Sequence, residues 1–385
     1  MRPESTNPLR IAVLGVGTIA RSVHLPLIAR HPGLELVAVG DLDEARAAGV
    51  ARAYGARAQS PAALIAAADV EAVLIATPGN HAAIAADALR AGKHVLAEKP
   101  LALTVADALA VADLAAERGL VAQVGSMKAH DAAVGVVRAA LAEIGELRLV
   151  EVSVRHPVDA PQLQHLRLDP PAPPPPVVAE AARAGDWADA ERVRAAVGDL
   201  PPAWHGLYRS VLCGSVLHEV SLLRALGTGL PAVFDHAALV PGEPGPPVLT
   251  ATGPLPSGAR LQLSWAWLPD YPEYEETVRL VGTAGAVVLD LAPPYVLDAR
   301  SSVEVLTRGD GPAGVRRRAV LGHDGAFQRQ LEAFAAAVRT GAPVLVDAAG
   351  AAADVACLQR LLAALAAGHG LVPGGEAAAA AAVPA

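Results

Sequence analysis

Cysteine, aromatic residues and positive charge are all scarce in this chain of 385 residues. Its two cysteines, Cys213 and Cys357, are too few for a disulfide framework or a cysteine-rich zinc site, and we expect no bound metal. The formal net charge of −8 argues against binding to nucleic acid. No apolar run reaches the roughly 18 residues of a membrane span, and residues 1–8 lack the apolar core of a secretion signal. These absences predict a cytoplasmic protein that binds neither nucleic acid nor membrane.

Residues 9–125 alternate short apolar runs with longer amphipathic segments. Strands are expected at 10–15, 34–40, 71–76, 94–97 and 120–124. Helices are expected at 18–30, 43–54, 61–67, 81–91 and 104–118. Most of these strands are continuous apolar runs, which are typical of a parallel sheet that is buried on both faces. The sequence therefore predicts an α/β fold whose N-terminal domain, residues 1–125, is a doubly wound parallel sheet.

The pattern changes after residue 125, and a second domain is expected over 126–370. Alternating apolar and polar residues predict strands at 147–154, 232–240, 247–251, 259–268, 276–282, 286–290 and 303–307. Helices are expected at 131–143, 324–339 and 348–367. A proline-rich insertion at 157–203 includes the tract 170–176, which predicts polyproline or loop, and short helices within 179–197 that Gly185 interrupts. Residues 371–385 are expected to be a disordered tail.

A glycine-rich turn follows the first expected strand. In Gly15-Val-Gly17-Thr-Ile-Ala20, Gly15 permits a tight turn and Gly17 lets the backbone approach a pyrophosphate, while Ala20 lets the helix pack closely on the strand. The next strand delivers Asp41, where a carboxylate can accept hydrogen bonds from the adenosine ribose. This order of strand, turn, helix, strand and acid predicts a dinucleotide-binding Rossmann unit.

Asp41 also bears on the choice of cofactor. A carboxylate at this position repels a 2′-phosphate, and the nearest guanidinium in the sequence belongs to Arg46. We therefore expect NAD(H) rather than NADP(H).

Three further motifs follow the glycine-rich turn along the chain. They are Ala76-Thr-Pro-Gly-Asn-His81, Ala91-Gly-Lys-His-Val-Leu-Ala-Glu98-Lys99-Pro100 and Gly214-Ser-Val-Leu-His218-Glu-Val-Ser-Leu-Leu-Arg224. Together with the turn, they resemble the Gfo/Idh/MocA oxidoreductases, such as glucose–fructose oxidoreductase and inositol dehydrogenase, over residues 9–125 and 205–367. The Glu-Lys-Pro sequence is the most specific of these elements.

The resemblance implies a fold and a reaction. The Rossmann domain would precede an α/β domain with a large, mostly antiparallel open sheet, which is often used for oligomer contacts, so a homo-oligomer (dimer or tetramer) is expected. The implied activity is hydride transfer between a nicotinamide and a carbinol or keto carbon of a sugar, cyclitol or sugar derivative. Cofactor contacts are implied for the turn and the strand ends, at Gly15, Gly17, Thr18, Ile19, Asp41, Thr77, Pro78, His81, Glu98 and Lys99.

Lys99 and His218 are the catalytic residues that the resemblance implies. A histidine can accept the proton of an alcohol near neutral pH, and an ammonium group can stabilise the developing alkoxide. Pro100 restricts the backbone of Lys99, and the resemblance implies a cis peptide bond between them. His81 stands one residue closer to the preceding proline than in the family pattern, which leaves its role open.

Gly214 is the main departure from the family pattern. Many relatives carry an aspartate four residues before the catalytic histidine, where this chain has no side chain. Three interpretations remain open: a two-residue Lys99–His218 centre, assisted by Tyr208 or His156; a substrate that brings its own charge; or loss of catalysis.

Five residues are candidates for contact with the substrate. They follow expected strands or precede His218, and they are His156, Lys128, Tyr208, Trp267 and Tyr271. Aromatic rings stack well on the apolar faces of sugars, although packing in the core explains each of them as well. The function predicted is an NAD(H)-dependent oxidoreductase; the alternatives are a non-catalytic nicotinamide-binding regulator of the same fold and a reductase of a non-sugar ketone or imine.

Overall fold

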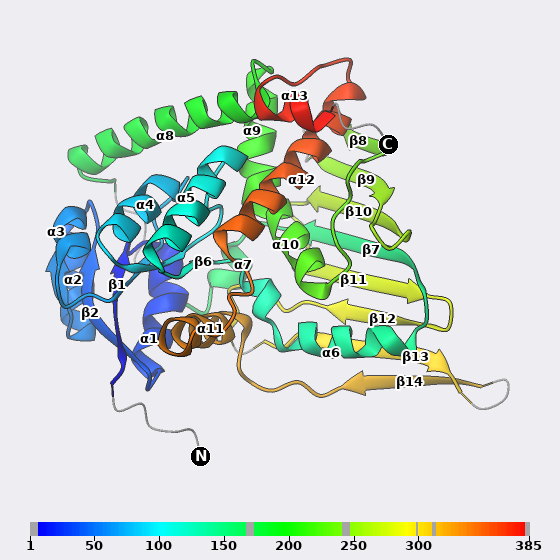
Figure 1. The fold of residues 1–385 in the computed structure, drawn as a ribbon, viewed down its shortest axis with the longest axis horizontal. Coiled ribbons are helices and arrows are strands. Elements are labelled where there is room, and N and C mark those ends of the chain that lie inside the picture. The colour runs from blue at the N-terminus through cyan, green and yellow to red at the C-terminus, as the bar shows by residue number, and fades with distance from the viewer. Residues whose placement is uncertain (1–6, 167–172, 241–246, 298, 310–312, 382–385) are drawn as a thin grey trace. The chain divides into compact units, whose positions relative to one another are not determined.

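The computed structural model describes residues 7–166, 173–240, 247–297, 299–309 and 313–381. The chain divides into two compact units, and each contains one sheet (Figure 1). Unit 1 comprises Met1–Ser126, Leu166–Ala195 and Phe327–Val355. Unit 2 comprises Met127–His165, Ala196–Ala326 and Ala356–Ala385.

Unit 1 is built on a six-stranded parallel sheet. Its strands are β1 (Leu9–Leu14), β2 (Leu34–Gly40), β3 (Arg57–Gln59), β4 (Ala72–Ile75), β5 (His94–Ala97) and β6 (Ala122–Val124). They lie in the order β3-β2-β1-β4-β5-β6, and each neighbouring pair is parallel. The strand order reverses between β1 and β4, and nucleotides bind at the carboxyl ends of strands beside such a reversal.

Helices connect the strands of unit 1. They are the π-helical turn η1 (Ala20–His24), α1 (Leu25–Arg30), α2 (Glu44–Tyr54), α3 (Pro61–Ala66), α4 (Ala82–Arg90) and α5 (Val105–Arg118). Side chains cap several of them: Asp43 accepts the Arg46 N–H at the start of α2, and Thr104 accepts the Asp107 N–H at the start of α5. The expected strands and helices are therefore confirmed in this unit, with β3 added between α2 and α3.

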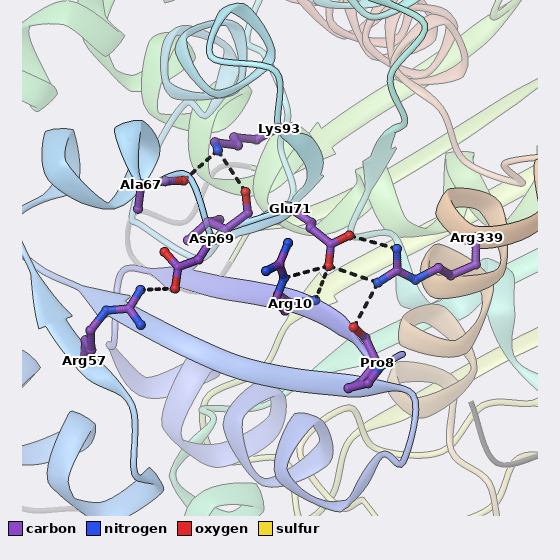
Figure 2. A network of polar contacts seen from close by, with 9 residues as sticks. Pro8, Arg10, Arg57, Ala67, Asp69, Glu71, Lys93 and Arg339 are labelled. Carbon is purple, nitrogen blue, oxygen red and sulfur yellow. Dashed lines mark hydrogen bonds and ion pairs between the residues drawn. The ribbon is translucent and has the colours of Figure 1, made fainter. Parts of the chain in front are cut away.

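Two later segments of the chain return to unit 1. They are most of α8 (Pro176–Val197) and α11 (Ala326–Thr340). In α11, Leu331 and Phe334 are buried in the same core cluster as Leu9 and Ile11 of β1. Figure 2 shows the polar side of this attachment, where Arg339 of α11 binds the carboxylate of Glu71 beside β4.

Unit 2 is built on an eight-stranded mixed sheet. Its strands are β7 (Leu147–His156), β8 (His236–Val240), β9 (Val248–Pro254), β10 (Arg260–Trp267), β11 (Glu275–Gly282), β12 (Gly285–Asp290), β13 (Ser302–Arg308) and β14 (Gly314–Ala319). The order is β14-β13-β12-β11-β7-β10-β9-β8, in which only β7 and β10 are parallel neighbours. The large, mostly antiparallel sheet implied by the resemblance is confirmed.

Helices and helical turns complete unit 2. They are η2 (Met127–His130), α6 (Ala132–Ala140), η3 (Leu141–Glu143), α7 (Ala160–Leu163), α9 (Pro202–Gly206), the π-helical η4 (Leu207–Val216), α10 (Leu217–Leu226) and α13 (Gly375–Ala381). Helix α10 contacts η2 and α6, and α6 contacts β12 and β13 (Figure 1). Helix α12 (Ala348–Ala367) begins in unit 1 and ends in unit 2.

The structure departs from the sequence predictions in four segments. Gly185 does not interrupt 179–197, because α8 is one continuous helix, and alanine-rich residues 375–381 form α13 where a disordered tail was expected. Strands β3 and β14 were not expected, since neither shows an apolar alternation; β14 has the sequence GVRRRA, as befits a charged edge strand. Residues 167–172 of the proline-rich insertion and 382–385 of the tail lie outside the described residues.

Most residues of helix α12 are apolar. Over the part of the chain that the structure describes, it is the one helix that is long and apolar enough to cross a membrane, and 67% of the window that meets this test is buried. Such burial is typical of a core helix in a folded domain.

Candidate functional site

The glycine-rich turn follows β1 and packs against the backbone at the carboxyl end of β4. Gly15 has a φ of +88°, and its N–H donates to the carbonyl of Gly40 at 2.8 Å. A Cβ atom at Gly15 would lie 2.7 Å from the carbonyl of Ala76 and from the backbone nitrogen of Thr77. Only glycine satisfies both the backbone angle and this close approach.

Beyond Gly15 the turn leaves room and unused polar atoms. A Cβ atom at Gly17 would meet nothing within 4 Å, and the neighbouring Thr18 is exposed. Thr77 Oγ1 is buried and has no hydrogen-bond partner among the described residues. Pro78 is exposed beside it, while Ile19 packs against the core of unit 1. Open backbone and an unsatisfied hydroxyl at the strand-order reversal fit a bound dinucleotide.

Asp41 lies at the end of β2 and is tied to the turn. Its Oδ2 accepts the N–H of Val16 at 2.9 Å, and its Oδ1 accepts the N–H of Asp43 at 2.9 Å. The guanidinium of Arg46 lies 3.8 Å from Asp41 and 3.1 Å from Asp43. Asp41 therefore holds the glycine-rich turn in place. Its carboxylate faces the guanidinium of Arg46, which also lies against the carboxylate of Asp43.

Glu98 and Lys99 form the turn after β5. The Glu98 carboxylate is buried; His24 Nε2 lies 2.8 Å from its Oε1, and its Oε2 accepts the N–H of Lys99 at 3.2 Å. Burial raises the pKa of Glu98, but the hydrogen bond from His24 and the charges of His24, Lys99 and His81 outweigh it, so the pKa is lowered on balance. The bond between Lys99 and Pro100 is cis, as the resemblance implied.

His81 precedes α4 and is only 1% exposed. Its Nδ1 lies 2.7 Å from the carbonyl oxygen of Pro100, and its Nε2 lies 2.7 Å from the carbonyl oxygen of Thr77. Main-chain carbonyls thus lie at hydrogen-bond distance from both ring nitrogens, and the cofactor contact expected of His81 stays a prediction.

His218 belongs to unit 2, at the start of α10. The preceding η4 is π-helical, a geometry that often occurs at functional sites. A Cβ atom at Gly214 would meet only the carbonyl of Arg209, at 3.6 Å, so a side chain fits there. Ser215 accepts a hydrogen bond from Trp265 Nε1 at 2.9 Å, which ties η4 to the end of β10.

Lys128 lies in a buried polar cluster rather than on an open surface. Its ammonium group lies 3.0 Å from Glu219 Oε1 and 3.0 Å from the Tyr274 hydroxyl, and it also binds Glu276. Burial opposes the charge of Lys128, but the two carboxylates raise its pKa well above the usual value. Burial also raises the pKa of Glu219, to about 7. The donors of Lys128 are engaged inside unit 2, and contact with substrate stays a prediction.

His156 lies among aromatic rings at the end of β7. Its Nδ1 donates to the carbonyl of Pro157 at 2.7 Å, and its ring centroid lies 5.1 Å from that of Trp267 and 5.4 Å from that of Tyr274. The pairing of His156 with Trp267 follows from the parallel register of β7 and β10. The structure thus brings two of the five substrate candidates together.

The other two substrate candidates lie elsewhere in unit 2. Tyr208 is fully buried, and burial raises its pKa well above the usual value, so it belongs to the core, contrary to expectation. Tyr271 is partly exposed and donates a hydrogen bond to Glu275 Oε1 at 2.7 Å.

Sequence reasoning missed His24, Glu219 and Glu276. His24 and Glu219 are polar residues within apolar stretches of sequence, whereas Glu276 follows other polar residues, and such groups are buried only when they have partners. That signal was available, although the partners lie far away in the chain. No group of three or more His, Cys, Asp or Glu side chains that could hold a metal ion occurs among the described residues.

Comparison with known proteins gives one family match. Residues 9–126 match the Gfo/Idh/MocA family, described as "Oxidoreductase family, NAD-binding Rossmann fold". Among curated proteins, the chain is 39% identical over 158 residues to dTDP-3,4-didehydro-2,6-dideoxy-alpha-D-glucose 3-reductase of Streptomyces violaceoruber, over 40% of this chain and 46% of that protein. It is 43% identical over 128 residues to inositol 2-dehydrogenase 3 of Saccharopolyspora erythraea, over 32% of this chain and 38% of that protein.

The chain thus spans less than half the length of these two curated relatives. The likeness extends further among solved structures. UDP-N-acetylglucosamine 3-dehydrogenase from Acidithiobacillus ferrooxidans superposes with a TM-score of 0.68, covering 92% of this chain and 97% of that one at 24% identity. At this identity, the similarity establishes the fold of both units and nothing more.

Proposed function

We propose that this chain, whose residues 9–126 match the Gfo/Idh/MocA oxidoreductase family with its NAD-binding Rossmann fold, is an NAD(H)-dependent oxidoreductase. It transfers a hydride between the nicotinamide and a carbinol or keto carbon of a sugar, cyclitol or sugar derivative. The observation that carries this proposal is the turn at Gly15 and Gly17, whose backbone is open at Gly17. The buried Thr77 hydroxyl, which has no hydrogen-bond partner among the described residues, lies at the same strand-order reversal.

The dinucleotide is held by the residues at the carboxyl ends of the unit 1 strands. Backbone groups of Gly15, Gly17, Thr18 and Ile19 hold the pyrophosphate, and Asp41 accepts hydrogen bonds from the adenosine ribose. Thr77, Pro78, Glu98 and Lys99 surround the nicotinamide end. When bound, the nicotinamide supplies or accepts the hydride.

NAD(H) is preferred over NADP(H) in this proposal. The Asp41 carboxylate repels a 2′-phosphate, and Arg46 already lies against the two carboxylates of Asp41 and Asp43. A phosphate at this point would have to compete with both carboxylates for one guanidinium group.

Lys99 and His218 carry out the chemistry on the substrate. The Lys99 ammonium binds the reacting oxygen and stabilises the negative charge that develops on it. His218 takes the proton from the hydroxyl group during oxidation and returns it during reduction. His156 and Trp267, at the ends of β7 and β10, offer an imidazole and a ring face to a sugar.

A hydride-transfer screen tests this function. Purified protein is incubated with NAD⁺ and a panel of cyclitols, sugars and nucleotide sugars, and formation of NADH is followed by absorbance. We expect turnover of at least one compound, a loss of about 100-fold or more in Lys99→Ala and in His218→Ala, and nearly unchanged NADH affinity in both variants. If both variants turned over as fast as the parent protein, the assignment of these two residues would be wrong.

Gly214 favours a second candidate function. Without a carboxylate at this position, the chain is a nicotinamide-binding regulator that has lost the chemistry. A Cβ atom at Gly214 would meet only the carbonyl of Arg209, at 3.6 Å, so Gly214→Asp is the variant that tests this alternative. A regulator binds NADH but turns over no substrate, whether as the parent protein or as Gly214→Asp. An enzyme turns over its substrate as the parent protein.

We further propose a cytoplasmic homo-oligomer. Cys213 and Cys357 are both buried and neither is in a disulfide, which suits a reducing compartment. The eight-stranded sheet provides a broad face for a second copy, and Arg155–Glu275 and Arg260–Asp235 ion pairs lie exposed on it. Light scattering of the purified protein gives its mass in solution; a monomeric mass would reject the oligomer.

A further inference from the structure

His81 makes two contacts that an uncharged imidazole cannot satisfy together. The carbonyl oxygens of Thr77 and Pro100 each lie 2.7 Å from one of its ring nitrogens. A carbonyl oxygen only accepts hydrogen bonds, and a neutral imidazole carries a single N–H. With one proton, one nitrogen lone pair would face a carbonyl lone pair at hydrogen-bond distance inside the protein. Both contacts are favourable only when both nitrogens carry protons.

The two carbonyls belong to the two turns that flank the expected nicotinamide position. Thr77 follows β4, and Pro100 follows Lys99 at the end of β5. The backbone N–H of His81 also donates to the carbonyl of Leu101 at 3.1 Å. His81 thus joins the start of α4 to both turns through three hydrogen bonds.

The charges around His81 suit a cation. Glu98 carries a buried carboxylate, and the charge of His81 helps to lower its pKa. From α8, Asp189 is buried with its Oδ2 only 2.7 Å from the place of a Cβ atom on Gly79, which has a φ of +82°. The cations that face the same carboxylate are Lys99 and, when protonated, His24. The carboxylate of Glu98 and, next to Gly79, the carboxylate of Asp189 thus place negative charge on the turns that His81 contacts.

We propose that His81 is a positioning residue, kept as an imidazolium, whose two N–H groups hold the carbonyls of Thr77 and Pro100 and thereby fix the backbone of Lys99. The inference rests on the proposed function for the role of Lys99, but the protonation state of His81 stands on geometry alone. Loss of the second proton would release one of the two turns.

Nitrogen NMR of the full-length protein labelled at histidine tests the protonation state directly. At about pH 8 an ordinary histidine is neutral, and His94 provides an internal neutral reference, because its Nδ1 accepts the N–H of Val121 at 3.0 Å. We expect one ring with two protonated nitrogens at this pH, and its signals should disappear in His81→Phe. A neutral tautomer for His81 would overturn the inference whether or not the protein turns over any substrate.

Substitution then tests the positioning role. His81→Phe keeps the ring but removes both donors, and we expect kcat to fall about 100-fold while the Kd for NADH changes less than about threefold. His81→Gln, whose amide has two N–H donors, should recover part of kcat, and His94→Gln should leave kcat unchanged. An unchanged kcat in His81→Phe would overturn the role. If the parent protein shows no turnover, the proposed function fails, and the NMR result still decides the state of His81.

Discussion

At the scale of single residues, the candidate site depends on side chains that bind main-chain atoms. Asp41 accepts the N–H of Val16, Glu98 accepts the N–H of Lys99, and His81 contacts two carbonyls. Each of these polar groups shapes the turn beside it as well as carrying charge. Substitutions at these positions must therefore separate the loss of charge from the loss of a backbone contact.

Asp41 allows that separation. In Asp41→Asn one acceptor oxygen remains for the Val16 N–H, but the negative charge is lost, so we expect the affinity for NADPH to rise about tenfold relative to NADH. Asp41→Ala loses the acceptor oxygens and the charge, so it should weaken the binding of NADH as well. Fluorescence titration with each nucleotide measures the ratio of the two dissociation constants. A preference that stays the same in Asp41→Asn would refute the argument from charge.

Alanine substitution of the two glycines of the turn separates a structural role from a role in binding. Gly15→Ala places a Cβ atom against the backbone of Ala76 and Thr77 at a positive φ, and we expect it to destabilise the protein by about 2 to 4 kcal/mol in urea denaturation. Gly17→Ala meets no neighbour, so it should fold as the parent protein does and lose NADH affinity instead. Equal stability of Gly15→Ala, or unchanged NADH binding by Gly17→Ala, would contradict this division of roles.

Sequence analysis was most successful where the chemistry is local. The positions of Gly15 and Asp41 followed from a strand, a turn and a spacing within about 30 residues of each other. The buried partners of Lys128 could not be predicted, because Glu219 and Glu276 are 91 and 148 residues away. Nothing in its own neighbourhood distinguishes a lysine that is held by buried carboxylates from one that faces a ligand.

At the scale of elements, the Lys128 cluster joins three parts of unit 2. Lys128 comes from η2, Glu219 from α10, Glu276 from the start of β11, and Tyr274 from the residue just before that strand. Glu219 directly follows His218, so the cluster fixes the start of the helix that carries the proposed acid–base residue. The π-helical η4 just before it could not have been predicted, because an apolar helical stretch does not reveal its hydrogen-bond pattern.

Removing the Lys128 charge should therefore act on stability. Lys128→Met leaves two buried carboxylates without their cation, and we expect a loss of about 3 to 5 kcal/mol in the free energy of unfolding at neutral pH. Because burial raises the pKa of Glu219 from 4.5 to about 7, the loss should shrink as the pH falls from 7 towards 4.5, below which this carboxyl group is protonated in the folded and the unfolded states alike. Lys128→Met with unchanged stability but a raised KM would instead support the original interpretation that Lys128 contacts substrate.

At the scale of the whole molecule, the chain returns to its first unit after building the second. Helix α11 packs on β1, and Arg339 binds Glu71, 268 residues earlier in the chain (Figure 2). Arg339 also donates to the carbonyl of Pro8, while Glu71 accepts the N–H and the Nε–H of Arg10. The helix itself was predicted from its apolar periodicity, but its place in unit 1 depends on contacts too distant for sequence patterns to show.

The Glu71 contacts predict a dependence of stability on pH. The hydrogen bond from Arg339 is the largest influence that lowers the pKa of Glu71, from 4.5 to about 2. A lowered carboxyl pKa stabilises the folded state above pH 4.5, and this stabilisation is lost as the pH falls towards 2. We expect Glu71→Gln to destabilise the protein by about 1 to 3 kcal/mol at pH 7 and to converge with the parent protein near pH 2. A difference that stays constant over that range in thermal unfolding would contradict the assignment.

The central claim is that the turn at Gly15 and Gly17 binds a nicotinamide dinucleotide. A fluorescence titration of the purified protein with NADH and with NADPH tests it most directly, once the sample has been checked for nucleotide that copurifies. The account predicts saturable binding that is tighter for NADH. No binding of either nucleotide, by a protein that carries none already, would contradict the account and remove the basis for an oxidoreductase.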